Sequence, residues 1–227
     1  MLRLLLLICL GFGAYQLYHK GWPESRASTG AVDRSGKPAV VLAVAPGCGE
    51  ACDSIRTLLQ TRGMAFEEIS VTGPDGAPLE NKYGIQGYPT TLVGKLKIEG
   101  NDLGRVTAAL AETFGDQVLG RMERAAMAGH FDSAGKPKIV LYGTKWCGYC
   151  TAQRDLFAAK GIGYDDVDVE ASDAAKLAYD SLKGAGYPLT YVGYRRFSGF
   201  QEQEILAAID ELVGQSAPTA ATDRNLN

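Results

Sequence analysis

The residues with the clearest chemical potential are Cys147 and Cys150, which lie three positions apart in the segment Trp-Cys-Gly-Tyr-Cys at 146–150. An apolar, strand-like run precedes them and a helical pattern follows, so we expect Cys147 to begin a helix. Unpaired N–H groups and the positive dipole end at a helix N-terminus favour thiolate over thiol. Cys150, one turn further on, can close a disulfide with Cys147 or resolve a mixed disulfide. The pattern predicts redox chemistry; the alternatives are half of a zinc site or two inert core thiols.

The chain contains one sequence unit twice. Gly-Lys-Pro-Ala-Val-Val-Leu at 36–42 recurs as Gly-Lys-Pro-Lys-Ile-Val-Leu at 135–141, and Tyr-Pro-Thr-Thr-Leu-Val-Gly at 88–94 recurs as Tyr-Pro-Leu-Thr-Tyr-Val-Gly at 187–193. Each copy has the pattern of a strand, a helix that begins at cysteine, a strand, a short helix, two short strands and an amphipathic helix. This order predicts an α/β fold of two tandem domains, each a mixed sheet sandwiched by helices.

The repeat and the composition of the intervening segments predict the organisation of the chain. We expect a helix over 116–127 ahead of the joint, and a disordered tail because its apolar residues show no periodicity. The predicted segments are a signal anchor at 1–18, a linker at 19–37, a domain with the Cys-x-x-x-Cys pair at 38–127, a linker at 128–136, a domain with the Cys-Gly-Tyr-Cys pair at 137–214 and the tail at 215–227.

Both copies resemble the thioredoxin superfamily over nearly their whole length, and the second is most similar to glutaredoxins. Trp-Cys-Gly-x-Cys and Tyr-Gly-Ile-Gln-Gly-Tyr-Pro-Thr (83–90) are also similar to segments of protein disulfide isomerases and thioredoxins. The resemblance implies a thiol–disulfide oxidoreductase in which Cys147 attacks and Cys150 resolves. It implies cis peptide bonds before Pro89 and Pro188, which expose the preceding backbone to an extended substrate peptide. The implied substrate contacts are Trp146, Tyr149, Tyr187, Pro188, Ser198, Gly199 and Lys145.

Some positions depart from the family pattern. Glutaredoxins usually carry lysine three residues before the first cysteine, where this chain has Thr144. They also carry Gly-Gly after the cis-proline, where this chain has Ser-Gly-Phe-Gln at 198–201. Glutathione is therefore a candidate co-substrate only, and no firmly bound cofactor or metal is expected in the second copy. Thioredoxins keep a buried acid where this chain has Leu141. Arg195 and Arg196 either supply positive charge near the cleft or are ordinary solvated surface.

The first copy spaces its cysteines as Cys48-Gly-Glu-Ala-Cys52, with Cα atoms expected near the upper end of the disulfide range. Glu50 and Asp53 oppose a thiolate at Cys48. Three interpretations stay open: a second redox centre, a docking domain with a structural disulfide, or a Cu(I) site.

Residues 1–18 are apolar except for Arg3 and Gln16, which predicts a short signal anchor. We expect an inner-membrane anchor with both domains facing the periplasm; the alternatives are cleavage and secretion, or the cytoplasmic face. Expected partners are disulfide-bearing proteins and a thiol reductant or membrane electron donor. The net charge of −3, without a basic cluster, gives no support for nucleic acid. The alternative function is a non-enzymatic copper-binding or client-docking module.

Overall fold

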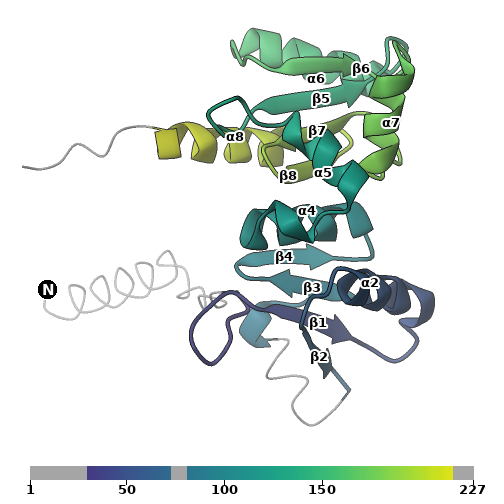
Figure 1. Cartoon of the computed structure of the whole chain (residues 1–227), viewed down its shortest axis with the longest axis vertical. Coiled ribbons are helices and arrows are strands. Elements are labelled where there is room, and N and C mark those ends of the chain that lie inside the picture. The colour runs from purple at the N-terminus through teal and green to yellow at the C-terminus, as the bar shows by residue number, and fades with distance from the viewer. Residues whose placement is uncertain (1–29, 73–80, 217–227) are drawn as a thin grey trace, which may run out of the picture.

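A computed structural model describes residues 30–72 and 81–216 (Figure 1). They form two units in which the four strands and the first and last helices follow the same order. The first unit contains β1 (Val40–Val44), α2 (Gly49–Thr61), β2 (Glu67–Ser70), β3 (Thr90–Val93), β4 (Leu96–Glu99) and α4 (Leu103–Phe114). The second contains β5 (Ile139–Gly143), α6 (Gly148–Ala159), β6 (Asp165–Asp168), α7 (Asp173–Ser181), β7 (Leu189–Val192), β8 (Arg195–Ser198) and α8 (Glu202–Ser216). Between the units lie the 3-10 helix η1 (Asp116–Val118) and α5 (Arg121–Ala128).

Each unit is built on a four-stranded mixed sheet, as the sequence predicts. The strand orders are β2-β1-β3-β4 and β6-β5-β7-β8. In each sheet the first-listed pair is parallel and the other two pairs are antiparallel. A parallel pair needs a crossover connection, and the cysteine-bearing helices α2 and α6 supply it. In Figure 1 the arrows of β1 and β5 point to the same side of the molecule, so both cysteine pairs follow strand ends on that side.

The repeat begins further upstream than the sequence predicts. Asp33 accepts hydrogen bonds from the backbone N–H groups of Ser35 (2.8 Å) and Lys37 (3.0 Å), and Asp132 binds the equivalent N–H groups in the second unit. These turns fold back so that Ala31 and His130 are fully buried. The segments expected to be linkers, 19–37 and 128–136, therefore contain ordered parts of the two units. A short polar turn carries too little apolar pattern to reveal this from sequence.

The helix expected over 116–127 is interrupted. The 3-10 helix η1 ends at Val118, Leu119 adopts an extended backbone conformation, and α5 begins at Arg121. Gly120 caps α5 through its backbone N–H, which donates to the Glu123 carboxylate at 2.8 Å. At the other end of the chain, α8 continues to Ser216, past the expected domain end at residue 214.

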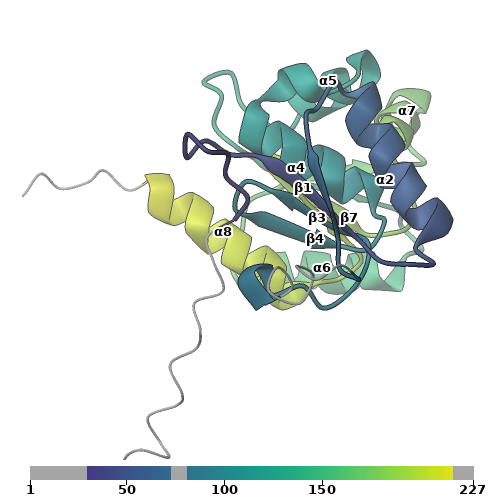
Figure 2. The same cartoon turned by 90° about the horizontal axis from the view of Figure 1, so that it is seen from below.

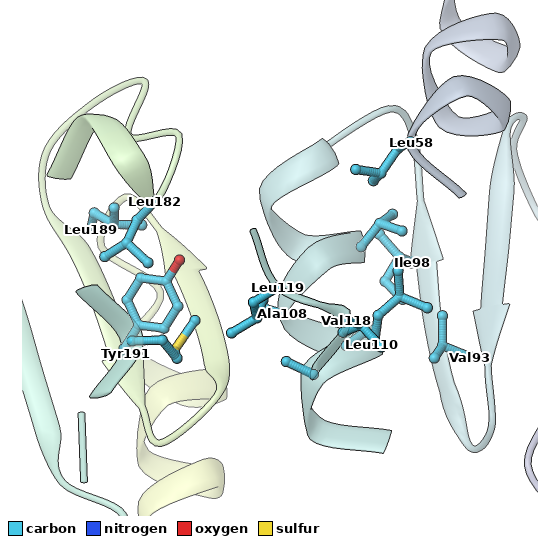
Figure 3. Close-up of a cluster of buried hydrophobic side chains, with 14 of the residues drawn as sticks. Leu58, Val93, Ile98, Ala108, Leu110, Val118, Leu119, Leu182, Leu189 and Tyr191 are labelled. Atoms are coloured by element: carbon cyan, nitrogen blue, oxygen red, sulfur yellow. The ribbon is translucent and has the colours of Figure 1, made fainter. Parts of the chain in front are cut away.

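One hydrophobic core joins the two sheets (Figure 3). It runs from Val93 and Ile98 of the first sheet through Leu110 of α4 to Leu189 and Tyr191 of the second sheet. Figure 1 shows α4 lying between β4 and β8, and in the view from below β7 overlaps β3 and β4 (Figure 2). Helix α4 therefore covers both sheets at once. A separate cluster, which includes Phe157 and Ile205, covers the opposite face of the second sheet with α6 and α8.

The outward face of α4 differs from that of its repeat partner α8. In α4 this face consists of small, buried residues: Gly104, Thr107, Ala108 and Ala111. The equivalent positions in α8 are Gln203, Leu206, Ala207 and Asp210, of which only Leu206 is partly buried. Small side chains let α4 approach the second unit closely, whereas α8 needs polar groups because its outer face meets solvent.

Within the described ranges, no helix is both long and apolar enough to cross a membrane. The predicted anchor at 1–18 and residues 217–227 of the predicted tail lie outside these ranges.

His130 is buried in the core of the second unit. Its Nδ1 lies 3.0 Å from the Met127 sulfur and its Nε2 lies 3.0 Å from the Tyr142 hydroxyl. A neutral imidazole satisfies both contacts, because Nδ1–H can donate to sulfur while Nε2 accepts the hydroxyl proton. The ring also stacks on Tyr191 with centroids 4.4 Å apart. Burial lowers the pKa of His130 to about 4 and raises the pKa of Tyr142 to about 12.

We expect the protein to lose stability as pH falls from 6.5 to 4. In this interval the unfolded chain binds a proton at His130 that the folded chain does not, so acid favours unfolding by up to about 3 kcal/mol. Urea unfolding at pH 7 and pH 4.5 measures this. In His130→Gln, unfolding should take up about one proton fewer, so the free energy of unfolding should depend less on pH. An unchanged pH dependence in this variant would contradict the assignment of this effect to His130.

Candidate active site

The second cysteine pair lies where β5 passes into α6. Cys147 caps the helix: its sulfur accepts the backbone N–H of Cys150 at 3.1 Å. The two cysteines are disulfide-bonded, with Cα atoms 5.2 Å apart. Cys147 is 7% exposed, whereas Cys150 is fully buried. This geometry places Cys147 at the helix N-terminus, as the sequence predicts, and makes it the more exposed residue of the pair.

Gly143, the last residue of β5, gives the buried sulfur its space. A Cβ atom at this position would lie 3.0 Å from the sulfur of Cys150, which is tighter than normal packing. Three residues further along the helix than Cys150, Gln153 is also fully buried and donates to the hydroxyl of Thr190 at 2.6 Å.

Gln153 is a polar neighbour of the buried cysteine that our sequence analysis missed. Its side-chain oxygen has no partner among the described residues. The repeat contains the signal, because the equivalent position in the first unit is Ile55, a core residue. Leu141 is fully buried in the place of the thioredoxin acid, so the amide of Gln153 is a polar group near Cys150 that carries no charge.

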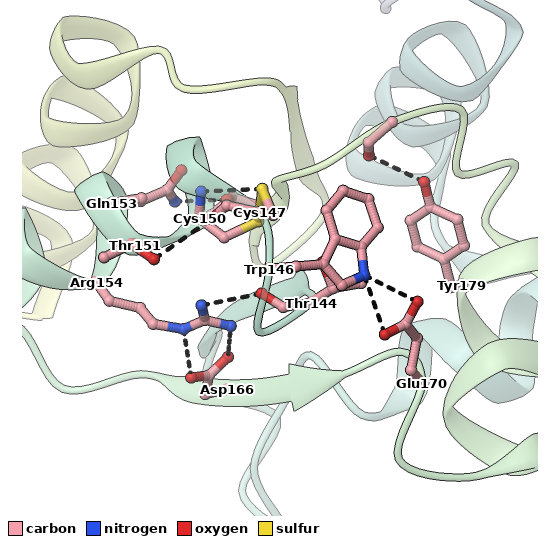
Figure 4. Close-up of a disulfide and its surroundings, with 12 residues drawn as sticks. Thr144, Trp146, Cys147, Cys150, Thr151, Gln153, Arg154, Asp166, Glu170 and Tyr179 are labelled. Atoms are coloured by element: carbon pink, nitrogen blue, oxygen red, sulfur yellow. Dashed lines mark hydrogen bonds and ion pairs between the residues drawn. A yellow bond between two sulfur atoms is a disulfide. The ribbon is translucent and has the colours of Figure 1, made fainter.

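Aromatic side chains line the accessible side of the disulfide (Figure 4). Trp146 is 69% exposed, yet its indole N–H donates to both carboxylate oxygens of Glu170 at 3.0 and 3.1 Å. Its ring meets Tyr187 edge to face, with centroids 5.9 Å apart. Tyr187 in turn packs on Tyr179 at 5.0 Å. Tyr149 is equally exposed. Glu170 therefore fixes the exposed indole, a role that the sequence analysis did not predict.

The peptide bonds Tyr88–Pro89 and Tyr187–Pro188 are both cis, as the family resemblance implies. The carbonyl of Pro188 accepts the N–H of Gly199 at 2.8 Å. Gly199 has φ of 81°, a conformation that favours glycine. Ser198 is exposed at the end of β8. The structure thus brings Tyr187, Pro188, Ser198 and Gly199 together beside Trp146.

The basic residues expected near the cleft have other partners. Lys145 is well exposed, and its ammonium lies 3.6 Å from Asp168. Arg195 binds Glu112 of α4 and Glu211 of α8, and Arg196 binds Asp102 at the N-terminus of α4. The two arginines therefore join the units. Neither expectation for them, cleft charge or plain solvated surface, describes this role, because it depends on packing against α4.

The first cysteine pair has a different geometry. Cys48 and Cys52 are disulfide-bonded with Cα atoms 5.5 Å apart, a typical separation and not the upper end of the range. Cys48 is partly exposed and Cys52 is buried. Cys48 caps α2 with a helical backbone conformation and no side-chain hydrogen bond. Its sulfur therefore lacks the N–H contact that Cys147 receives.

The fold and the cysteine sites define a protein of two thioredoxin-like units. Residues 139–195 match the glutaredoxin family model, so this part of the second unit is a glutaredoxin domain.

Curated relatives match the chain over different lengths. A protein disulfide-isomerase of Aspergillus niger, tigA, is 26% identical over 185 residues, which are 68% of this chain and 51% of that protein. A putative glutaredoxin of Mycobacterium tuberculosis is 39% identical over 46 residues, which are 20% of this chain and 55% of that protein. The chain thus spans about half the length of these relatives. Among solved structures, a buckwheat glutaredoxin–glutathione complex is similar with a TM-score of 0.33 and 16% identity, over 41% of this chain and 92% of that one.

Proposed function

We propose that the protein is a thiol–disulfide oxidoreductase that works through Cys147 and Cys150. The observation that carries this proposal is the position of Cys147: its sulfur lies at the N-terminus of α6 and accepts the N–H of Cys150 at 3.1 Å. An N–H donor and the helix dipole both stabilise negative charge on this sulfur once the pair is reduced. Cys147 is then the thiolate that attacks.

The exchange balances with the two cysteines alone. The Cys147 thiolate attacks one sulfur of the substrate disulfide, and the other substrate sulfur leaves as a thiolate that takes up a proton. Cys150 loses its proton and attacks the Cys147 sulfur, which forms the intramolecular disulfide and releases the second substrate sulfur. With Leu141 in the position of the thioredoxin acid, the proton from Cys150 passes to water or to the leaving thiolate.

We propose disulfide-bearing proteins as substrates and a thiol reductant as the electron source. Glutathione is a candidate for this reductant, supported by the glutaredoxin match over 139–195. We also propose an anchored, periplasm-facing placement with a membrane electron donor as the alternative reductant; only the apolar sequence at 1–18 supports it.

The first unit should contribute little to turnover of small disulfides. Cys48 lacks the N–H contact of Cys147, and Glu50 adds negative charge to the same helix turn. A lower thiolate fraction gives slower attack at neutral pH. A variant carrying Cys48→Ala and Cys52→Ala should therefore keep most of the wild-type rate, measured as reduction of a small dialkyl disulfide with a thiol reductant.

The same experiment tests the proposed function, because Cys147 and Cys150 are then the only disulfide-bonded cysteines left in the described part of the chain. Loss of turnover in this variant would contradict the assignment of the second pair. Copper retained by the reduced wild-type protein and lost in the variant would instead support the metal-binding alternative for the first unit.

A further inference from the structure

A hollow of about 550 Å³ lies at the junction of the two units, beside the predicted substrate contacts. The second unit lines it with Tyr187, Ser198 and Gly199, and the first unit lines it with the loop at 101–104 that leads into α4. Tyr187 also contacts Trp146 next to Cys147. Tyr187 therefore links the hollow to the neighbourhood of the disulfide, and the volume of the hollow is in the range of ligand-binding sites.

We propose that this hollow, the inter-unit groove, binds the polypeptide of a disulfide substrate on one side of the reacting cysteine. The first unit then forms one wall of the substrate site. This inference rests on the proposed function, because the occupant of the inter-unit groove is the substrate polypeptide that flanks the substrate disulfide.

The two walls of the groove are held together by Arg196. Its side chain is 3% exposed, forms an ion pair with Asp102 in the first unit and donates to the carbonyl of Lys183 in the second unit at 2.8 Å. Gly104 allows this contact, because a Cβ atom there would overlap the guanidinium. Lys183 has φ of 56°, which is uncommon for a residue other than glycine. The groove is thus preformed by buried contacts, which lowers the entropy cost of binding.

The charges along the groove indicate which polypeptides it accepts. Arg196 neutralises Asp102, whereas Lys183 is exposed and its ammonium has no carboxylate partner among the described residues. The groove therefore has one unpaired positive charge. Tyr187 also borders a second hollow, whose charged lining is Glu170, Asp173 and Lys176 and therefore carries more negative than positive charge. A substrate with an acidic residue on the groove side of its cysteine complements this arrangement.

The test compares a short peptide disulfide that carries glutamate beside its cysteine with a small neutral dialkyl disulfide. Asn101 is exposed at the edge of the groove, so Asn101→Trp fills it without disturbing the core. The ratio of kcat/KM for the peptide to that for the small disulfide should fall about tenfold. Gln60→Trp, at an exposed position on α2, is the control and should leave this ratio unchanged.

A second variant tests the charge and does not depend on how a tryptophan is accommodated. Lys183→Gln should lower kcat/KM for the glutamate peptide roughly threefold relative to the matched lysine peptide. Lys160→Gln, an exposed lysine at the end of α6, is the control. Equal kcat/KM ratios in the wild type, in Asn101→Trp and in Lys183→Gln would contradict substrate binding in the inter-unit groove. Failure of the wild-type protein to turn over the small disulfide would instead contradict the proposed function.

Discussion

Replacing Cys147 with serine should lower disulfide reduction by about three orders of magnitude or more, because a serine hydroxyl does not ionise at neutral pH and cannot carry the exchange. Cys150→Ser should behave differently. Cys147 can still attack, but the site then has no second thiol to release the substrate, so a mixed disulfide accumulates when the reduced variant meets the substrate without added thiol reductant. The measurement is turnover of a small disulfide together with mass spectrometry of the trapped adduct.

The reduced wild-type protein supplies the control for these roles. Cys147 lies at the helix N-terminus and retains a small exposed area, whereas Cys150 is fully buried. Iodoacetamide at neutral pH should therefore label Cys147 first. Equal labelling of both thiols would contradict the assignment of Cys147 as the attacking thiolate. The same Cys150→Ser variant, used in cells, captures the physiological partners as mixed disulfides.

Ala108→Glu should destabilise both units by about 3 kcal/mol or more. Ala108 is 3% exposed on the outward face of α4, where it lies close to Leu182 and Tyr191 of the second unit. A carboxylate at this position loses most of its hydration. The neighbouring guanidinium groups of Arg195 and Arg196 already bind Glu112, Glu211 and Asp102, so pairing with the new carboxylate would break existing ion pairs. Urea unfolding in a Trp22→Phe background, so that tryptophan fluorescence reports only Trp146 of the second unit, followed separately by this fluorescence and by circular dichroism, measures the effect.

The matched control is Ala207→Glu at the equivalent position of α8. Ala207 is exposed, so this substitution should change the free energy of unfolding by less than about 0.5 kcal/mol. A small effect in both variants would show that the core shared across α4 contributes little. Two separate unfolding transitions in the wild-type protein would contradict a jointly stabilised pair of units.

Much of the fold could be predicted from the sequence because its signals are local. The duplication, the strand that leads into a helix at Cys147 and the Tyr-Pro before the last hairpin all follow from residue types at fixed spacing. They correspond to β5, the cap of α6 and the cis bond before Pro188. The turns at Asp33 and Asp132 were missed although both copies contain them. A short polar turn has too little apolar pattern to indicate an ordered element.

The candidate site was predicted only in part. Cys147, Cys150 and Pro188 come from motifs, and the structure brings them together with Tyr187. Glu170 was not predicted because it lies 24 residues beyond Trp146 in the chain, and Gln153 was not predicted because its role depends on its contact with Thr190 of β7. The sequence signal for Gln153 was the comparison of the two copies, because position 153 is polar whereas the equivalent position in the first copy is the apolar Ile55.

Residue types and spacing along the chain are enough to predict two repeated units and a cysteine pair at a helix start, because strands, helices and caps depend on neighbouring residues. The packing of the two units is what makes α4 cover both sheets, lets Arg196 bind Asp102 and places the first unit along the inter-unit groove. Such contacts join residues distant in the chain, and their geometry depends on which faces of the two units meet. The sequence indicates this packing in one place: the outward residues of α4 are small, whereas the equivalent residues of α8 are larger or more polar.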